Sequence, residues 1–323
     1  MMLPLVPLQQ LRSALAEQKR VQVLVQREDL VHRTRSGNKL YKLCFNIQYA
    51  KQHGMQTLVS FGGGYSNHLH ALALAGQEEG MNTVGIIRGD YRANLTATLR
   101  DCQAAGMQVR FVDRQQWALR NTSEYCLSLH ADFSNAYIIP EGGDNALGFR
   151  GTRLLGQQIG RQLQGLPPSG CTHVLVACGT GTTMAGIVAE MPAGVAVLGV
   201  SPLKGDDKLT AAISAKLVQA SIEPQCSWKI DRRFCLEGYG RLPNELERFI
   251  RFFERKFMIP LDPVYTAKVM FALFTMLEAD EFQPGDRVIV IHTGGLQGKR
   301  GYPKLMSPLH SSARLKSINI GAF

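Results

Sequence analysis

A glycine- and threonine-rich segment, Cys178-Gly-Thr-Gly-Thr-Thr-Met-Ala-Gly186, follows a predicted strand and opens a predicted helix. Glycines let the backbone turn tightly, and the N–H groups at the start of a helix attract anions through hydrogen bonds and the helix dipole. Met184 stands where a dinucleotide-binding G-x-G-x-x-G/A segment needs its third small residue, and no G-x-x-x-x-G-K-[ST] loop occurs. The segment therefore predicts a site for a small phosphorylated cofactor, with a purely structural glycine turn as the alternative.

A second strand-to-helix junction, Phe61-Gly-Gly-Gly-Tyr-Ser-Asn-His68, contains a serine. The serine of a hydrolase nucleophile elbow needs G-x-S-x-G, and His68 occupies the position of the last glycine, so a hydrolase is disfavoured. Ser66 and Asn67 equally suit the cap of a helix. His68 and His70 would point to different faces of a helix and no H-E-x-x-H occurs, so we expect no metal site.

The third unusual segment is Ser36-Gly-Asn-Lys-Leu-Tyr-Lys-Leu43. Lys39 directly follows a Gly-Asn pair and precedes an apolar helical pattern, and Lys42 lies three residues further along. A solvated surface position is the commonest fate of a lysine, so these residues alone leave the role of Lys39 open.

The scaffold that must position these segments is an α/β one. Short β-rich segments alternate with helical patterns from about residue 57 onward, which is typical of βαβ units and a parallel sheet. The predicted strands are 57–61, 83–88, 108–112, 136–139, 173–177, 195–200 and 287–292. The predicted helices include 66–79, one that ends near Glu190, and 244–257, whose apolar residues recur at helical spacing and indicate core packing. Ligands gather at the carboxyl ends of strands in open α/β sheets, so the glycines at 62–64, 179–181 and 294–295 predict one or two clefts.

Composition agrees with a soluble globular protein. The chain has 323 residues, of which 45% are hydrophobic and 19% charged, and this length suits two domains of roughly 100 to 200 residues. No stretch approaches the roughly 18 apolar residues of a membrane helix. The first 20 residues lack the basic start and cleavage site of a secretory signal, so we expect a cytoplasmic protein. The seven cysteines contain no C-x-x-C pair, which predicts free and mostly buried thiols rather than disulfides or zinc ligands.

The net charge of +10 is unevenly distributed. Beyond Asp286 there is no acidic residue, while the same stretch contains Arg287, Lys299, Arg300, Lys304, Arg314 and Lys316. No basic run interleaved with aromatic residues and no zinc finger accompanies this charge, so we expect no nucleic-acid partner.

Five segments, taken in their order along the chain, resemble the pyridoxal-phosphate-dependent D-cysteine desulfhydrase and 1-aminocyclopropane-1-carboxylate deaminase family. They are Gly37-Asn38-Lys39 with Lys42-Leu43, Gly62-Gly63 with Ser66-Asn67-His68, the loop from Gly179 to Gly186, Asp262-Pro-Val-Tyr-Thr266, and Thr293-Gly294-Gly295. The resemblance spans about residues 27 to 298 and includes Arg27-Glu-Asp29 and Pro140-Glu-Gly-Gly143.

The resemblance implies the tryptophan synthase β-like fold. This is an α/β fold of two domains, each an open and mostly parallel sheet with helices on both faces, with pyridoxal 5'-phosphate between the domains and usually a homodimer. The larger, cofactor-binding domain is expected to comprise residues 1–43 and 154–323, and the smaller domain residues 44–153. The expected partner is a small amino-acid substrate, and no membrane is expected.

The resemblance also implies roles for individual residues. Lys39 matches the lysine that forms the internal Schiff base, which suits a partly desolvated amine better than a surface one. Asn67 matches the residue beside the ring hydroxyl of the cofactor, and Ser66 matches one near the reacting Cα. The other implied site residues are the active-site tyrosines Tyr239 and Tyr265, the phosphate-binding residues Gly179, Thr180, Gly181, Thr182 and Thr183, and the cofactor-ring residues Thr266 and Thr293.

Three positions depart from the family pattern. Tyr65 replaces a glutamine, Tyr41 replaces an arginine, and Thr182 replaces the second glycine of the phosphate loop. Two of these lie where substrate or domain packing would be affected, so they bear on the substrate more than on the fold or the cofactor.

The choice of reaction depends on Thr266 and Thr293, which replace the glutamate and leucine of the cyclopropane deaminases. A glutamate near the pyridine nitrogen would keep it protonated and strengthen the electron sink, whereas a threonine hydroxyl only shares a hydrogen bond. The first hypothesis is therefore a lyase that eliminates the β-group of D-cysteine or a related D- or β-substituted amino acid, giving a 2-oxo acid and ammonia. The alternatives are 1-aminocyclopropane-1-carboxylate deaminase and a catalytically silent protein that binds pyridoxal phosphate or another anion.

Overall fold

The computed structural model describes residues 5–35, 37–205 and 208–306, and the chain divides into two compact units. The larger unit comprises Met1–Val31 and Arg153–Phe323, and the smaller unit comprises His32–Thr152. The predicted domain limits lay at 43/44 and 153/154, and the two compact units divide at 31/32 and 152/153, so that Lys39 lies in the smaller unit. Ser36 and the end of the basic tail, residues 307–323, lie outside the described residues.

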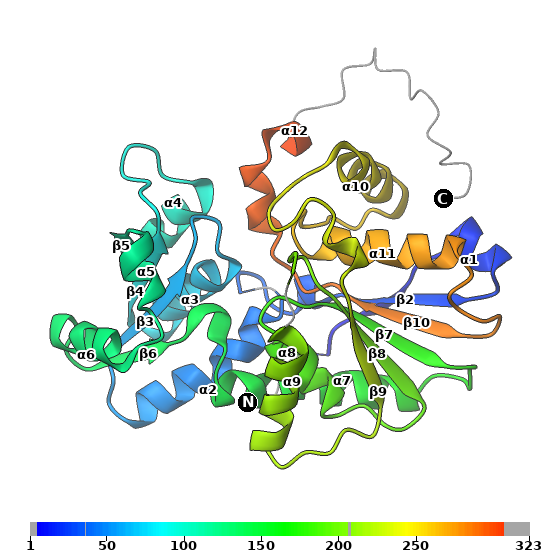
Figure 1. Cartoon of the computed structure of the whole chain (residues 1–323), viewed down its shortest axis with the longest axis horizontal. Coiled ribbons are helices and arrows are strands. Elements are labelled where there is room, and N and C mark those ends of the chain that lie inside the picture. The colour runs from blue at the N-terminus through cyan, green and yellow to red at the C-terminus, as the bar shows by residue number, and fades with distance from the viewer. Residues whose placement is uncertain (1–4, 36, 206–207, 307–323) are drawn as a thin grey trace. The chain divides into compact units, whose positions relative to one another are not determined.

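The described part of the larger unit contains a six-stranded sheet in the order β1-β2-β10-β7-β8-β9 (Figure 1). Only β1 runs antiparallel to its neighbour, and every other adjacent pair is parallel. The strands are β1 Leu8–Gln10, β2 Gln22–Gln26, β7 Thr172–Ala177, β8 Val195–Val200, β9 Ser227–Asp231 and β10 Arg287–Ile291.

Helices cover both faces of this sheet, with α1, α10 and α11 on one side and α7, α8 and α9 on the other (Figure 1). They are α1 Ala14–Gln18, α7 Ala146–Gln164, α8 Thr182–Val188, α9 Lys208–Gln219, α10 Asn244–Phe257, α11 Thr266–Glu278 and α12 Pro303–Met306, with short 3-10 turns at Glu28–Leu30, Arg233–Cys235 and Leu296–Gly301. Helix α7 begins in the smaller unit and continues into the larger one.

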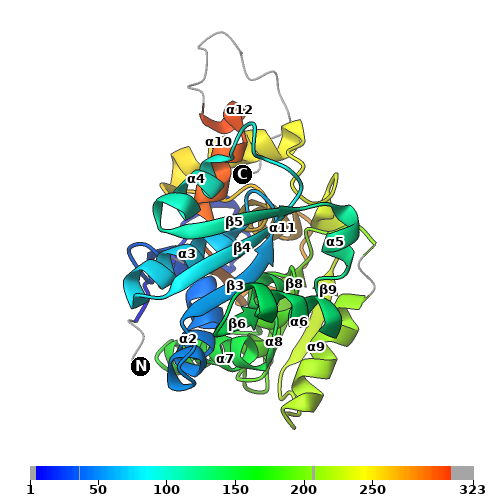
Figure 2. The same ribbon diagram turned by 90° about the vertical axis from the view of Figure 1, so that its left-hand side faces the viewer.

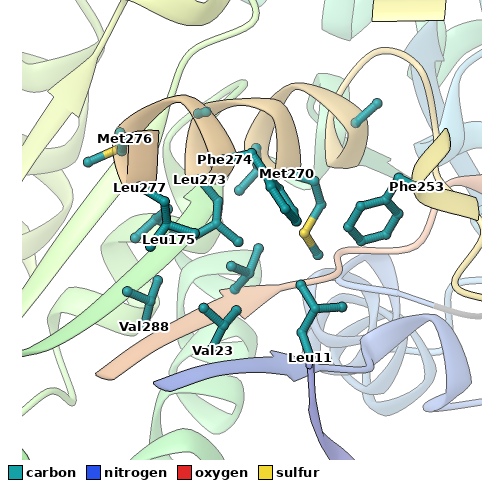
Figure 3. Packing of buried hydrophobic residues seen from close by; sticks show 14 of the residues in the cluster. Leu11, Val23, Leu175, Phe253, Met270, Leu273, Phe274, Met276, Leu277 and Val288 are labelled. Carbon is teal, nitrogen blue, oxygen red and sulfur yellow. The ribbon is translucent and has the colours of Figure 1, made fainter. Parts of the chain in front are cut away.

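The core under α11 shows why these elements form. Alternate strand residues such as Val23, Leu175 and Val288 point to the α11 face, as the two-residue period of a strand requires (Figure 3). The predicted stripe of α10 is confirmed as packing, because Phe253 is fully buried and its ring meets that of Phe274 of α11 edge to face, with centroids 6.1 Å apart. Burial of such aromatic side chains is the main favourable term for this layer.

The smaller unit contains a parallel four-stranded sheet in the order β5-β4-β3-β6 (Figure 2). Its strands are β3 Thr57–Gly62, β4 Asn82–Arg88, β5 Met107–Val112 and β6 Ala136–Ile139. One core cluster joins the sheet to α2 Lys39–Gln52, α3 Asn67–Glu79 and α4 Ala97–Ala104, and another joins it to α5 Arg114–Ala118 and α6 Ser123–Asp132. A 3-10 turn, Glu141–Gly143, follows β6.

Every predicted strand is present, with limits that shift by no more than one residue. The pattern did not predict the strands β1, β2 and β9 or the helices α1, α7, α9, α11 and α12. All seven cysteines are free, as expected, but only Cys102, Cys178 and Cys226 are buried. None of the helices in the described ranges combines the length and the apolar character that a membrane span needs.

Two glycines of α7 provide a matched test of helix packing. A Cβ at Gly151 would overlap the main-chain oxygen of Tyr41 in α2, whereas a Cβ at Gly160 would have no neighbour nearer than 3.7 Å. Because alanine is the better helix former by about 1 kcal/mol, Gly160→Ala should raise the free energy of unfolding by up to that amount. Gly151→Ala should lower it by about 1 to 3 kcal/mol, since α2 must move away. Urea unfolding followed by circular dichroism measures both, and an equal change in the two variants would contradict this packing.

Candidate active-site residues

Lys39 is the first residue of α2 in the smaller unit. The turn before it depends on Gly37, whose φ of 86° is open to glycine but disfavoured for other residues. Lys39 is half-buried, and its Nζ donates a hydrogen bond to Oδ1 of Asn38 at 3.0 Å. The Gly-Asn-Lys segment therefore aims the amine back toward the start of the helix, so Lys39 is not a fully solvated lysine.

Lys42 lies one turn further along α2 and is buried. Its Nζ donates to the carbonyl of Gly142 in the 3-10 turn after β6, at 3.1 Å. This bond ties α2 to the Pro140–Gly143 segment that the sequence singled out. The two lysines of the motif thus differ in burial and in their partners.

The β3–α3 junction adds Ser66 and Asn67, both half-buried. Ser66 is the N-cap of α3, and its Oγ accepts a hydrogen bond from the N–H of Leu69 at 3.2 Å, so the capping interpretation is confirmed. A Cβ at Gly62 would lie 2.5 Å from that Oγ, which explains the glycine. In the cap, the Ser66 hydroxyl only accepts a hydrogen bond, so capping leaves its proton available for donation. Tyr65, the departure from the family pattern, is 43% exposed.

His68, next along α3, is buried with an incomplete set of hydrogen bonds. Its Nε2 lies 2.9 Å from Oγ of Ser60, and this Oγ donates its own proton to the carbonyl of Ile139 at 2.7 Å. Nε2 must therefore carry the hydrogen, which leaves Nδ1 as an acceptor, and Nδ1 has no hydrogen-bond partner in the described chain. Burial, then the charges of Lys39 and Lys42, hold the pKa of His68 well below its ordinary value. His68 is thus a neutral imidazole beside the two lysines.

In the larger unit, the glycine- and threonine-rich loop joins β7 to α8, as predicted. Gly181 has a φ of 81°, and a Cβ there would lie 2.8 Å from Ile213. The N–H groups of Gly179 and Gly181 have no hydrogen-bond partner among the described residues. The hydroxyls of Thr180 and Thr182 lie 3.0 Å apart. A loop of this composition with unused N–H donors fits a phosphate group.

The two tyrosines implied by the family lie together beside this loop. The hydroxyl of Tyr265 donates to that of Tyr239 at 3.3 Å, and the rings meet edge to face with centroids 6.0 Å apart. A Cβ on Gly179 would lie 3.4 Å from the Tyr265 ring, so this ring stands over the start of the loop. Tyr239 is 52% exposed. The structure thus brings together Gly179, Tyr265 and Tyr239 from three separate segments.

Thr266 and Thr293, which the resemblance assigns to the cofactor ring, differ in the hydrogen bonds of their hydroxyl groups. Thr266 is buried; its Oγ1 accepts from the N–H of Asp262 at 2.7 Å and donates to the carbonyl of the same residue at 3.2 Å. Its single proton is therefore used within the main chain at the start of α11, and it has none to donate to a cofactor. Thr293 follows β10, and its hydroxyl has no partner in the described ranges.

His292 fixes the segment that carries Thr293. It is fully buried; its Nε2 donates to the carbonyl of Pro260 at 2.7 Å, and its Nδ1 lies 3.3 Å from the N–H of Gly294. Burial lowers the pKa of His292, although the carboxylate of Asp29 at 3.3 Å opposes this. The end of β10 is thereby joined to the segment that leads into α11.

The sequence analysis did not identify Asp262, His292 and Lys268 as residues that hold the backbone around the candidate site residues. Lys268 contacts only main-chain carbonyls, which leave no signal in the sequence. Asp262 accepts from the N–H groups of Val264 and Tyr265, an arrangement that the Asp-Pro-x-x segment suggests in retrospect as an Asx turn.

The chain matches a known enzyme family along almost its whole length. Residues 2–294 match the sequence model of the pyridoxal-phosphate-dependent enzymes, and the chain belongs to this family. The expected α/β fold and cofactor are thus confirmed, and the unpartnered N–H groups of the β7–α8 loop fit the phosphate of that cofactor.

Particular relatives place the chain within the 1-aminocyclopropane-1-carboxylate deaminase and D-cysteine desulfhydrase group. It is 28% identical to a Pyrococcus horikoshii protein whose assignment as a 1-aminocyclopropane-1-carboxylate deaminase is provisional, over 89% of each chain. It is 27% identical to D-cysteine desulfhydrase of Klebsiella pneumoniae, over 85% of this chain and 87% of the relative. A crystal structure described as an ACC deaminase homologue has a TM-score of 0.79 at 24% identity, covering 94% of both chains.

The neutral His68 predicts how stability depends on pH. An unfolded histidine has a pKa of about 6.5, so between that value and the lower folded value the unfolded chain binds more protons. The free energy of unfolding should therefore fall as pH decreases below about 6.5, by up to about 1.4 kcal/mol per pH unit for each such histidine.

His68→Gln tests this, because glutamine keeps an N–H donor for Ser60 and does not titrate. Urea unfolding from pH 7.5 to 5 should show a smaller slope in this variant, with a remainder from His292. Equal slopes in the native chain and His68→Gln would show that His68 is not held neutral.

Proposed function

We propose that this pyridoxal-phosphate-dependent enzyme is a lyase that acts on D-cysteine or a related D- or β-substituted amino acid. The reaction is an α,β-elimination that yields a 2-oxo acid, ammonia and the released β-group, which is sulfide for cysteine. The observation that carries this proposal is the pair Thr266 and Thr293, which place neutral hydroxyls where the cyclopropane deaminases carry glutamate and leucine. The kinship with a D-cysteine desulfhydrase supports it.

The residues that would hold the cofactor are those that match the family. Lys39 would hold it covalently, and Asn67 would contact its ring hydroxyl. Residues 179–183 would bind the phosphate through N–H groups and threonine hydroxyls. Thr293, rather than Thr266, would donate to the pyridine nitrogen, because the Thr266 hydroxyl is already used by Asp262.

Bound pyridoxal phosphate supplies an electron sink for the Cα of an amino acid. The chain's own part is to bind, orient and move protons. Once the substrate amine has displaced Lys39, its Nζ would take the α-proton. Ser66 Oγ retains a proton that helix capping does not use, and Tyr265 Oη is hydrogen-bonded to Tyr239, so either group could assist at the leaving β-group.

A neutral environment of the pyridine nitrogen favours elimination of a β-group over opening of a cyclopropane ring. A neutral threonine beside the pyridine nitrogen makes a weaker electron sink than a glutamate would, and a β-group that departs readily needs less stabilisation of negative charge. The second candidate is deaminase activity on 1-aminocyclopropane-1-carboxylate, which the Pyrococcus relative favours. Thr266 distinguishes the two, because ring opening demands the stronger sink and Thr266 stands where the cyclopropane deaminases carry the glutamate that would supply it.

The first test locates the cofactor. Lys39→Met and Lys42→Met are matched variants on one helix that keep an apolar stem and lose the amine. Because Lys42 Nζ is already bound to the Gly142 carbonyl, we expect borohydride to fix the cofactor on Lys39 in the native chain and in Lys42→Met, and on no lysine in Lys39→Met. Peptide mapping by mass spectrometry reads the result. A label on Lys42 in the native chain would overturn the assignment.

The second test concerns the substrate. We expect pyruvate from D-cysteine or β-chloro-D-alanine, and 2-oxobutanoate from 1-aminocyclopropane-1-carboxylate with kcat/KM at least about tenfold lower. This gap corresponds to about 1.4 kcal/mol in transition-state stabilisation. Coupled dehydrogenase assays measure both products, and comparable turnover of the two substrates would defeat the electronic argument.

Tyr65→Gln is the control for substrate size, because it restores the family residue at a half-exposed position. If the native chain turns over neither substrate while binding the cofactor covalently, a gain of activity in Tyr65→Gln would assign the block to the phenol. No activity in either protein would instead favour a silent binding protein.

A further inference from the structure

Lys268 in α11 is an unusual residue, because its side chain is 1% exposed in the core of the larger unit. Lysine is almost never fully buried without a partner. In the part of the chain that the structure describes, no carboxylate lies within ion-pair distance of Lys268. Its surroundings must therefore compensate the charge in another way.

Three main-chain carbonyls provide this compensation. Lys268 Nζ donates to Gly238 at 2.7 Å, to Cys235 at 2.8 Å and to Pro202, more weakly, at 3.5 Å. Three acceptors match the three donors of an ammonium group, whereas a neutral amine has only two. Burial lowers the pKa of Lys268, with Asp262 and Cys235 opposing and Lys204 adding to the effect. The three carbonyl oxygens are thus arranged as they would be around a bound monovalent cation, and the cation here is the ammonium group of Lys268, which is attached to α11.

The three carbonyls lie outside the strands and α-helices of the unit. Pro202 follows the end of β8, Cys235 ends the short 3-10 turn after β9, and Gly238 lies beyond that turn in the segment that carries Tyr239. In that segment Leu236 has a φ of 53° and Gly238 a φ of 108°, and a left-handed φ is disfavoured for leucine. An external contact must therefore keep this backbone in place.

We propose that Lys268 is a positioning residue, whose ammonium acts as a tethered cation that holds residues 235–240 so that Tyr239 meets Tyr265. The link is direct along the chain: Lys268 lies three residues after Tyr265 on α11, and its carbonyl partner Gly238 immediately precedes Tyr239. One ammonium therefore fixes both members of the tyrosine pair. The catalytic meaning of this pair rests on the proposed function, whereas its positioning does not.

The first experiment measures positioning without activity. In the full chain loaded with pyridoxal phosphate, Lys268→Met keeps the stem and removes the charge, and hydrogen–deuterium exchange reports local opening. We expect exchange in residues 235–241 to become at least about tenfold faster, with β7 and β8 unchanged. Lys229→Met, which removes an exposed lysine of the same unit, is the control and should change nothing there. Unchanged exchange in 235–241, or a uniform increase across the unit, would overturn the proposal.

A small cation should replace the missing ammonium. Lys268→Ala leaves space beside the three carbonyls, so ammonium or potassium chloride should restore protection of 235–241, whereas tetramethylammonium chloride at equal ionic strength should not. If Lys268→Ala folds only with added ammonium or potassium, the proposal is equally supported. Failure of both cations to restore protection or folding would reject a tethered cation.

Kinetics then connect Lys268 to Tyr239. With a substrate that the native enzyme turns over, Lys268→Met should lower kcat/KM by about tenfold or more, but by much less in a Tyr239→Phe background. Independent, additive effects would show that Lys268 does not act through Tyr239. If the native chain turns over no amino acid, the proposed lyase function fails while the exchange experiment still decides the positioning role.

Discussion

The parallel pairing of β10 between β2 and β7 is the constraint on which the larger unit depends. Parallel strands place all their carboxyl ends at one edge of the sheet. Here that edge receives Thr293 after β10, Gly179 after β7 and Pro202 after β8. Segments more than a hundred residues apart in sequence thus become neighbours at this edge. The buried face of α11 against β7 and β10 keeps the sheet in this register (Figure 3).

Main-chain carbonyls, rather than carboxylates, hold several of the buried basic groups. Lys42 donates to Gly142, Lys268 to three carbonyls, His292 to Pro260, and Arg287 to Pro167 at 2.6 Å. A carbonyl satisfies a donor without adding a negative charge, so each of these groups is anchored without depending on an ion pair. Burial also lowers the pKa of both His68 and His292, and the Asp29 carboxylate opposes this effect only at His292.

The three residues that depart from the family pattern, Tyr41, Thr182 and Tyr65, differ in their burial. Tyr41 is fully buried and its main-chain oxygen touches Gly151, so its position belongs to the contact between α2 and α7. Thr182 is also fully buried and pairs with Thr180 within the phosphate loop. Tyr65 is the only one of the three with substantial exposure.

Seven of the ten described strands, the glycine-rich junctions and α10 were predictable from the sequence, because each carries a local signal: a run of β-branched residues, a glycine that must adopt a positive φ, or an apolar stripe at helical spacing. Gly181 and the Ser66 cap are of this kind. The resemblance, built on the same local segments, was sufficient for the family and its cofactor. Helix α11 was not predicted, because nearly all its residues are buried and it shows no polar face.

Tertiary structure alone decided the features that depend on partners distant in sequence. Thr266 and Thr293 look alike in sequence, yet only the fold shows that Asp262 uses the hydroxyl of one and leaves the other without a partner in the described chain. The sequence alone suggests that Lys268 is a surface lysine. In the structure, the carbonyls of Pro202, Cys235 and Gly238 converge on its ammonium group. The limit between the units falls before Lys39 for the same reason, since packing against α3 and the Gly142 turn assigns α2 to the smaller unit. Main-chain carbonyls are identical at every residue, so no sequence pattern can indicate which of them a buried donor will meet.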